Sequence, residues 1–306
     1  MNKPEHFVFL GSKAAGLEVC QRLAARIKND AFKAIVCPDD TSDERSVLAD
    51  FKAIGEKYNI PVLVSQNSSH TARILDDLKP TTAIVHGWYQ IIPVDQFRNT
   101  LFLGFHYSPL PRYRGNAPLV WQIIEGESQL GVSFFELTTG MDEGRLVDQK
   151  LFDLGNNETI ANALVKANKL ALQMLDEFLS YWPESLPQLR EQPPLQASYC
   201  GMRTPEDGHI DWSLPATRVH DFIRAQAPPY PGAYAFLPDG SQVNLTKSTV
   251  ETNHWIGVPG AVLKVDTDYV LIACGQGAVR VYELALNGER PCSPSTLLKS
   301  MKIRLH

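Results

Sequence analysis

The chain has 306 residues, of which 44% are hydrophobic and 21% charged, and this composition is ordinary for a globular protein with a real core. Its net charge is −5 and its pI is near 5.9, so it repels a phosphate backbone unless its basic residues gather on one face. The longest basic cluster, Arg112-Tyr113-Arg114, is too short to follow a nucleic acid. We therefore expect a small-molecule substrate and no nucleic-acid partner.

The five cysteines are odd in number, widely scattered and without any CxxC pair. That pattern predicts reduced thiols in a cytoplasmic protein and no metal site. No apolar stretch approaches the roughly 18 residues that a membrane span needs, and the start of the sequence has too short an apolar run for a signal peptide. These features predict a cytoplasmic location without membrane contact.

Short apolar runs alternate with helical patterns through the first half of the chain. The runs expected to form buried strands are 6–10, 34–37, 60–64, 82–85, 101–105, 131–137 and 146–151. Stretches with polar faces, such as 17–27 and 46–56, separate the first of them. This alternation predicts an α/β fold with a mostly parallel sheet that helices cover on both faces.

The turn after the first expected strand reads GSKAAG, from Gly11 to Gly16. In the dinucleotide-binding motif a second glycine lets the backbone approach a pyrophosphate, but Lys13 stands at that position. We therefore interpret the segment as a plain strand-to-helix turn.

The chain changes character near residue 190. A helix begins at Asn157 and ends at Pro183, and residues 183–198 then carry four prolines without periodicity, which is typical of a surface linker. The short strands expected beyond Tyr199 are 233–237, 242–245, 261–265, 270–273 and 279–284. We expect a catalytic domain at 1–190, a linker at 191–199 and a C-terminal β-barrel domain at 200–306.

The loop after the strand at 101–105 is the most informative segment, and it reads HYSPLPRYRGNAPL from His106 to Leu119. His106 stands at the carboxyl end of a central strand, where open parallel sheets place their ligand crevices. Two prolines stiffen the loop, and Gly115 permits a sharp turn. The arrangement predicts an imidazole held in a fixed place for chemistry, although a loop histidine bonded to the backbone would give the same pattern.

A second candidate group lies in the turn TGMDEG, where glycines bracket Asp142 after a strand. Neighbouring strand ends can bring Asp142 beside His106. A histidine oriented by a carboxylate is an acid/base unit that works near neutral pH. The alternative is a carboxylate that only satisfies its own turn.

These segments together resemble a known family. HYSPLPRYRGNAPL resembles the H-x-SLLPxYRGxAP signature of the tetrahydrofolate-dependent formyltransferases, and GMDEGRL resembles their LDxGxI/L turn. A third stretch, residues 209–233, is similar to the IDW…IRA…PxPGA pattern of the family's C-terminal domain. The resemblance spans nearly the whole chain and implies a Rossmann-like sheet domain followed by an OB-like β-barrel.

The resemblance also implies an activity. Members of the family use 10-formyltetrahydrofolate as cosubstrate, and an amine of the acceptor attacks the formyl carbon. By this resemblance Asp142 helps to deprotonate the amine and orients the histidine, while His106 stabilises the oxyanion and moves protons. The resemblance implies no metal.

The family's folate pocket corresponds here to the segment Val85–Pro93 and to the turn before Asp142. The candidate folate-binding residues are His86, Gly87, Trp88, Tyr89, Ile91, Gly140 and Met141. The histidine can face the pocket or simply end a strand, and the two aromatic residues can form a stacking wall or belong to the core. The candidate substrate-binding residues are Tyr107, Ser108, Arg112 and Arg114, and the two arginines can grip a phosphate or lie on a solvated loop.

One position departs from the family pattern. The family usually carries Asn-x-His, with the asparagine donating to the formyl oxygen, and Gly104 occupies that position here. Loss of one oxyanion donor ordinarily raises the barrier by about 3 kcal/mol. Either another donor compensates or the chemistry differs.

The expected function is formyl transfer to the amine of a small acceptor, with an amino sugar on a nucleoside diphosphate as the favoured class. Methionyl-tRNA formylation is an alternative, but Asp39–Arg45 is acidic where the tRNA enzymes carry a basic insertion, and residues 201–306 balance ten Lys and Arg against ten Asp and Glu. A second alternative is a 10-formyltetrahydrofolate hydrolase, in which water replaces the amine and which Gly104 alone supports. A third is a folate-binding module without catalysis, against which His106 and Asp142 argue.

Overall fold

The computed structural model of the chain describes residues 5–27, 30–43, 46–185 and 187–306. The chain divides into two compact units, of which unit 1 comprises Met1–Arg114, Gly131–Lys150 and Ala167–Ser198, and unit 2 comprises Gly115–Leu130, Leu151–Lys166 and Tyr199–His306. Unit 2 thus includes two segments that precede residue 191, where the sequence pattern placed a single break.

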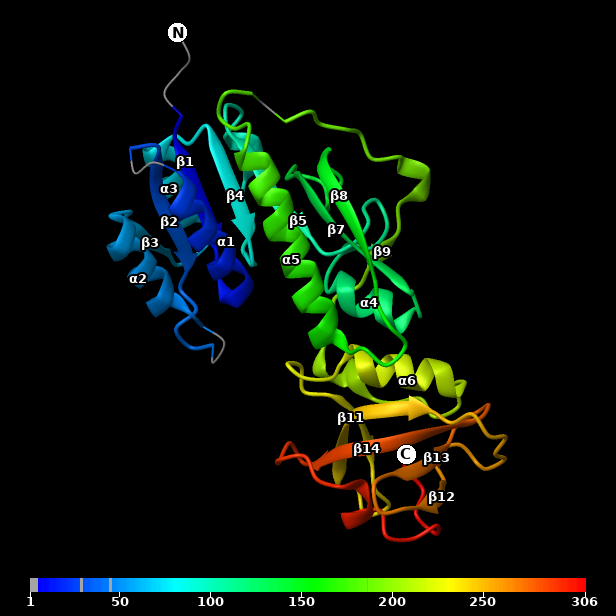
Figure 1. Cartoon of the computed structure of the whole chain (residues 1–306). Helices are drawn as coiled ribbons and strands as arrows, with labels where there is room; N and C mark the ends of the chain where they lie inside the picture. The colour runs from blue at the N-terminus through cyan, green and yellow to red at the C-terminus, as the bar shows by residue number, and fades with distance from the viewer. Residues whose placement is uncertain (1–4, 28–29, 44–45, 186) are drawn as a thin grey trace. The chain divides into compact units, whose positions relative to one another are not determined.

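Unit 1 is built on a seven-stranded sheet in the order β3-β2-β1-β4-β5-β7-β8 (Figure 1). Its strands are β1 (Phe7–Gly11), β2 (Phe32–Pro38), β3 (Val62–Ser65), β4 (Thr82–His86), β5 (Leu101–His106), β7 (Gln129–Glu136) and β8 (Leu146–Asp153). The first five strands pair in parallel, whereas β7 runs antiparallel to β5. The prediction of a mostly parallel sheet is confirmed.

The central strands are buried along their whole length. Every residue of β1 and β4 is buried, which is why these segments read as continuous apolar runs instead of alternating ones.

The chain's α-helices are α1 (Lys13–Arg26), α2 (Leu48–Tyr58), α3 (Ser68–Leu78), α4 (Pro118–Ile124), α5 (Ile160–Leu179) and α6 (Ala216–Ala225). None of the helices in the described parts of the chain has the length and apolar character of a membrane span.

Local sequence explains several helix ends. Asn67 caps α3, since its side chain accepts a hydrogen bond from the backbone N–H of His70 at 2.9 Å. Asn59 and Lys79 end α2 and α3 in the left-handed conformation. Gly16 lies within α1, where a Cβ atom would come within 2.8 Å of the carbonyl oxygen of His86, so the glycine lets α1 approach β4.

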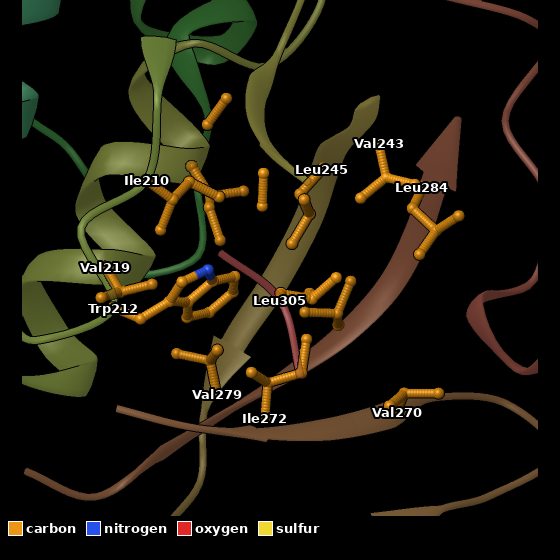
Figure 2. Close-up of a cluster of buried hydrophobic side chains, with 14 of the residues drawn as sticks. Ile210, Trp212, Val219, Val243, Leu245, Val270, Ile272, Val279, Leu284 and Leu305 are labelled. Atoms are coloured by element: carbon orange, nitrogen blue, oxygen red, sulfur yellow. The ribbon is translucent and has the colours of Figure 1, made fainter. Parts of the chain in front are cut away.

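Unit 2 contains a five-stranded antiparallel sheet in the order β10-β11-β14-β13-β12. Its strands are β10 (Ala233–Phe236), β11 (Gln242–Val250), β12 (Val262–Val265), β13 (Val270–Ala273) and β14 (Ala278–Leu286). Side chains from the sheet and from α6 form one apolar core, in which Trp212 lies among Val219, Leu245 and Ile272 (Figure 2). The prediction of a separate C-terminal β unit is confirmed.

The described residues also form two short strands and four 3₁₀ turns. The strands are β6 (Arg114–Gly115) and β9 (Tyr199–Cys200), which pair with each other. The 3₁₀ turns are η1 (Val94–Gln96), η2 (Pro194–Gln196), η3 (Pro205–Gly208) and η4 (Pro294–Thr296).

The core of unit 2 gives a first testable prediction. Ile272 is fully buried and Ile256 is 85% exposed, so the two isoleucines form a matched pair. Ile272→Ala is expected to lower the free energy of unfolding by about 2–5 kcal/mol, because it leaves a cavity as well as removing buried surface. Ile256→Ala should change it by less than about 0.5 kcal/mol. Urea denaturation followed by tryptophan fluorescence measures both, and similar losses would contradict the burial described here.

Candidate active site

His106 is the last residue of β5 and is 9% exposed. Its Nε2 lies 2.8 Å from the backbone carbonyl oxygen of Tyr113. A carbonyl can only accept a hydrogen bond, so Nε2 carries the proton and donates. The bond fixes the ring and leaves Nδ1 as the nitrogen that is open to chemistry.

The loop after His106 is held by its own hydrogen bonds. The Ser108 hydroxyl donates to the Arg112 carbonyl at 2.7 Å, and the Ser133 hydroxyl donates to the Ser108 carbonyl at 2.7 Å. The Leu110 N–H donates to the Ser133 oxygen at 3.1 Å. Ser108, expected to contact substrate, is fully buried and closes the loop that presents Tyr113 to His106.

Asp142 lies in the loop between β7 and β8, and its Oδ2 is 3.7 Å from His106 Nδ1. The structure therefore brings the two predicted catalytic residues together. Asp142 has a φ of +50°, in the left-handed region that only a well-supported non-glycine residue adopts. Glycine is required at Gly144 nearby, where a Cβ atom would lie 1.8 Å from the Glu136 carbonyl oxygen.

The route of this loop differs from the expected one. Because β7 runs antiparallel to β5, Glu136 at its end lies opposite Leu103 and not opposite His106. The Leu137 N–H donates to the Phe102 carbonyl at 2.9 Å, and the chain then returns along β5 until Asp142 reaches His106. A bidentate pair from Arg145 to Glu136, at 2.8 and 3.0 Å, closes the base of the loop.

A further contact to this loop comes from Gln192, which the sequence pattern placed in a surface linker. Its amide nitrogen donates to the carbonyl oxygens of Asp142 at 2.8 Å and Gly144 at 2.6 Å. The prolines around Gln192 carry no periodic signal, so nothing in the sequence pointed to this contact.

Gly104, at the position of the family asparagine, has its side-chain space filled by Leu137. An ideal Cβ atom on Gly104 would lie 2.7 Å from Leu137 Cδ1 and 3.1 Å from the Val85 carbonyl oxygen. Leu137 itself packs against buried Leu110, Phe135 and Leu146. The missing side chain therefore belongs to a packed arrangement and leaves no hole.

His86 and Tyr107, expected at the folate and acceptor sites, are bonded to each other. The Tyr107 hydroxyl donates to Asn168 Oδ1 at 2.5 Å, so it accepts at 3.0 Å from His86 Nε2, which carries the proton. Burial lowers the pKa of His86 to about 4, so the imidazole is neutral at pH 7. Burial raises the pKa of Tyr107, which stays protonated.

The other residues expected to bind folate lie on the loops after β4 and β7. Tyr89, Ile91 and Met141 are 58%, 79% and 60% exposed. Trp88 packs partly against the core of the sheet, and its buried indole N–H has no hydrogen-bond partner among the described residues. Gly87 has a φ of +70°, and a Cβ atom there would lie 2.2 Å from the Ser12 carbonyl oxygen. Gly140 precedes Met141 in the loop that carries Asp142.

The two arginines expected to bind substrate have different surroundings. Arg112 is exposed, and its guanidinium lies over the Tyr113 ring at 5.2 Å. Arg114 is buried, and it donates to Gln192 Oε1 from Nη2 at 2.8 Å and from Nε at 3.2 Å. Arg112 is thus an exposed residue in contact with Tyr113, whereas Arg114 is buried and held by Gln192.

The turn after β1 is a strand-to-helix turn, as interpreted from the sequence. The Ser12 hydroxyl donates to the Gly87 carbonyl, and Lys13 Nζ bonds Asp40 Oδ2 at 2.7 Å and Asp43 Oδ2 at 2.8 Å. In the acidic segment 39–45, Glu44 and Arg45 lie outside the described residues. Within the described ranges, no group of three or more His, Cys, Asp or Glu side chains is placed to hold a metal ion.

The packing at Gly104 gives a second prediction. Gly104→Asn is expected to lower the free energy of unfolding by about 1–3 kcal/mol, because the new side chain overpacks the space that Leu137 fills. In a Leu137→Ala background the same substitution should cost less, since the methyl groups that it meets are gone. Urea denaturation of the four proteins gives both costs, and equal costs would show that Leu137 is not the obstacle.

Comparison with known proteins gives consistent matches over both units. The sequence model described as "Formyl transferase" matches residues 22–178, and that described as "Formyl transferase, C-terminal domain" matches residues 203–302. A methionyl-tRNA formyltransferase of Geobacter metallireducens is 28% identical over 302 residues, which cover 97% of this chain and 96% of that protein. A methionyl-tRNA formyltransferase of Citrifermentans bemidjiense is 30% identical over 257 residues, covering 83% of this chain and 80% of that protein.

A solved structure shares the fold. WlaRD, a sugar 3N-formyl transferase crystallised in the presence of dTDP and 5-N-formyl-THF, matches with a TM-score of 0.71 at 18% identity, over 92% of this chain and 98% of that one. This fold and the two sequence models agree with the motifs around His106 and Asp142. The chain therefore belongs to the formyl transferase family of folate-dependent enzymes.

Proposed function

We propose that this enzyme transfers a formyl group from 10-formyltetrahydrofolate to the amine of a small acceptor, namely an amino sugar carried on a nucleoside diphosphate. The observation that carries formyl transfer is the pair formed by His106 Nδ1 and Asp142 Oδ2 at 3.7 Å. A carboxylate beside an imidazole with one committed nitrogen can take a proton from an attacking amine and return it to a leaving nitrogen.

The proposed proton path follows from the hydrogen bond that commits His106 Nε2 to Tyr113 and from the position of Asp142 beside Nδ1. Asp142 takes a proton from the amine as the new bond between nitrogen and the formyl carbon forms. Asp142 passes this proton to the unprotonated Nδ1 of His106, which gives it to the nitrogen of the carrier as the old carbon–nitrogen bond breaks, so both groups return to their starting protonation states. The Tyr113 carbonyl keeps Nε2 occupied throughout, so protons are exchanged at Nδ1, the nitrogen beside Asp142.

The residues present fit a folate carrier. Tyr89, Ile91 and Met141 expose apolar side chains on loops that the sequence assigns to the carrier, and exposed apolar groups of this size are typical of ligand sites. These side chains would hold the carrier, which supplies the activated formyl group.

Charge supports a small acceptor over a tRNA. Lys13 pairs with Asp40 and Asp43, which lie in the described part of the segment after β2. The positive charge of Lys13 is therefore already matched by carboxylates. In unit 2, salt bridges pair Lys264 with Asp266 and Arg280 with Glu251. A cation that one of the protein's own carboxylates already binds gains less from releasing the counterions of a nucleic acid.

Two further observations bear on the acceptor. Arg112 is exposed on the loop that carries His106, where a guanidinium can bind the phosphates of a nucleotide-linked sugar. The structural relative WlaRD is a sugar formyltransferase. Both favour the amino-sugar proposal.

Methionyl-tRNA formylation is the second candidate, because the two curated relatives described above carry that name and one match spans 97% of this chain.

The hydrolase alternative rests on Gly104, which leaves the formyl oxygen without the family's asparagine donor. Water is a weaker nucleophile than a deprotonated amine, so we expect slow hydrolysis and fast transfer.

The catalytic assignment gives a third prediction. His106→Ala and Asp142→Ala should each lower kcat about a hundredfold or more and leave carrier affinity nearly intact, because both groups act mainly in the transition state. The double variant should be little worse than either single one, since the two side chains act as a unit. Steady-state kinetics with a carrier-binding titration measures this, and full activity in either single variant would refute the assignment.

The acceptor assignment gives a fourth prediction. Release of the free carrier from 10-formyltetrahydrofolate is expected to be slow with water alone, fast with one of a panel of amino-sugar nucleotides, and unchanged by methionyl-tRNA. Asp142→Ala serves as the control for uncatalysed release. Acceleration by methionyl-tRNA alone would favour the tRNA enzyme, and equal rates with and without any amine would favour the hydrolase.

A further inference from the structure

Gln192 is the buried member of an exposed segment. It is 6% exposed, whereas its neighbours Glu191, Pro193 and Pro194 are exposed. A buried polar side chain in such a segment is informative, because its burial costs free energy unless its hydrogen bonds are made.

The side chain of Gln192 makes all the hydrogen bonds that an amide can make. Its oxygen accepts two, from Nε and Nη2 of Arg114, at 3.2 and 2.8 Å. Its nitrogen donates two, to the carbonyls of Asp142 and Gly144, at 2.8 and 2.6 Å. Two acceptor and two donor positions are thus filled, which also fixes the orientation of the amide.

These four bonds join the two loops that carry the reacting groups. On one side they hold the backbone of Asp142, whose left-handed conformation needs support. On the other side they hold Arg114, the residue next to Tyr113, whose carbonyl orients His106. One side chain therefore lies between the carboxylate and the group that orients the imidazole.

The rest of the segment is attached to the same two loops. Arg190 and Leu146 exchange backbone hydrogen bonds at 2.7 and 2.8 Å just beyond the Asp142 loop. Ser198 accepts the N–H of Tyr113 on its hydroxyl at 2.9 Å and the N–H of Arg114 on its carbonyl at 2.8 Å. Residues 190–198 thus form a strap that touches the Asp142 loop at one end and the His106 loop at the other.

We propose that Gln192 is a positioning residue that sets the separation of His106 and Asp142 through these four hydrogen bonds. The proposal rests on the proposed function in that the pair it positions is the one that moves the proton. A small displacement of a reacting group costs much of the rate, so loss of Gln192 acts on turnover more than on binding.

The test compares Gln192→Met, which keeps the length of the side chain and removes its hydrogen bonds, with Gln196→Met, in which the replaced glutamine is exposed. Gln192→Met is expected to lower kcat roughly tenfold to a hundredfold with little change in KM for carrier and acceptor. Gln196→Met should leave both unchanged. Gln192→Glu, which keeps an acceptor for Arg114 but has no donor for the two carbonyls, should lose kcat similarly and decides the matter if Gln192→Met fails to fold.

A positioning role is separated from a general structural one by the Asp142→Asn background. There Gln192→Met should have little further effect on kcat, because the carboxylate that it positions is gone. An undiminished loss of kcat in that background, or wild-type kcat in Gln192→Met, would overturn the proposal.

A readout without turnover keeps this result apart from the fate of the proposed function. The imidazole ¹⁵N signals of His106, assigned with a His106→Gln variant, should shift in Gln192→Met and stay in place in Gln196→Met. If no acceptor supports transfer, these signals still decide the role of Gln192. Unchanged His106 signals would contradict it.

Discussion

The hydrogen bond from His106 Nε2 to the carbonyl of Tyr113 decides what the site can do. It commits one nitrogen of the imidazole and leaves the other to face Asp142. Two features of the loop position that carbonyl: Tyr113 adopts a φ of +61°, and the Ser108 hydroxyl holds the backbone just before it. The proposed acid/base pair therefore depends on backbone geometry as much as on the two side chains.

Support for the site comes from segments far apart in the chain. His106 ends β5, Asp142 follows β7, and Gln192 comes from the chain beyond α5. No two of these three residues are close in sequence, so the site forms only when unit 1 is folded. His86, bonded to Tyr107, is a buried polar group beside β5. Its lowered pKa keeps it neutral, so it adds no charge near His106 at neutral pH.

The sequence predicted much of this and missed the rest for physical reasons. Continuous apolar runs predicted the buried strands, and the loop motif with the turn around Asp142 predicted that His106 and Asp142 meet, which the distance of 3.7 Å between Nδ1 and Oδ2 agrees with. The direction of β7 left no mark on its sequence, because an antiparallel strand buried on both faces reads like a parallel one. Gln192 was missed because its partners are backbone carbonyls and a distant arginine, and such contacts impose no periodicity.

Gly104 and Leu137 carry a consequence for how this enzyme can change over evolutionary time. Each residue makes the other acceptable: the leucine occupies the space that the glycine leaves, and the glycine spares the leucine a collision. A lineage that acquired asparagine at this position by one substitution would meet a crowded intermediate, so the two positions are expected to change together. Epistasis of this kind holds a sequence in its present state even where the alternative chemistry would be faster.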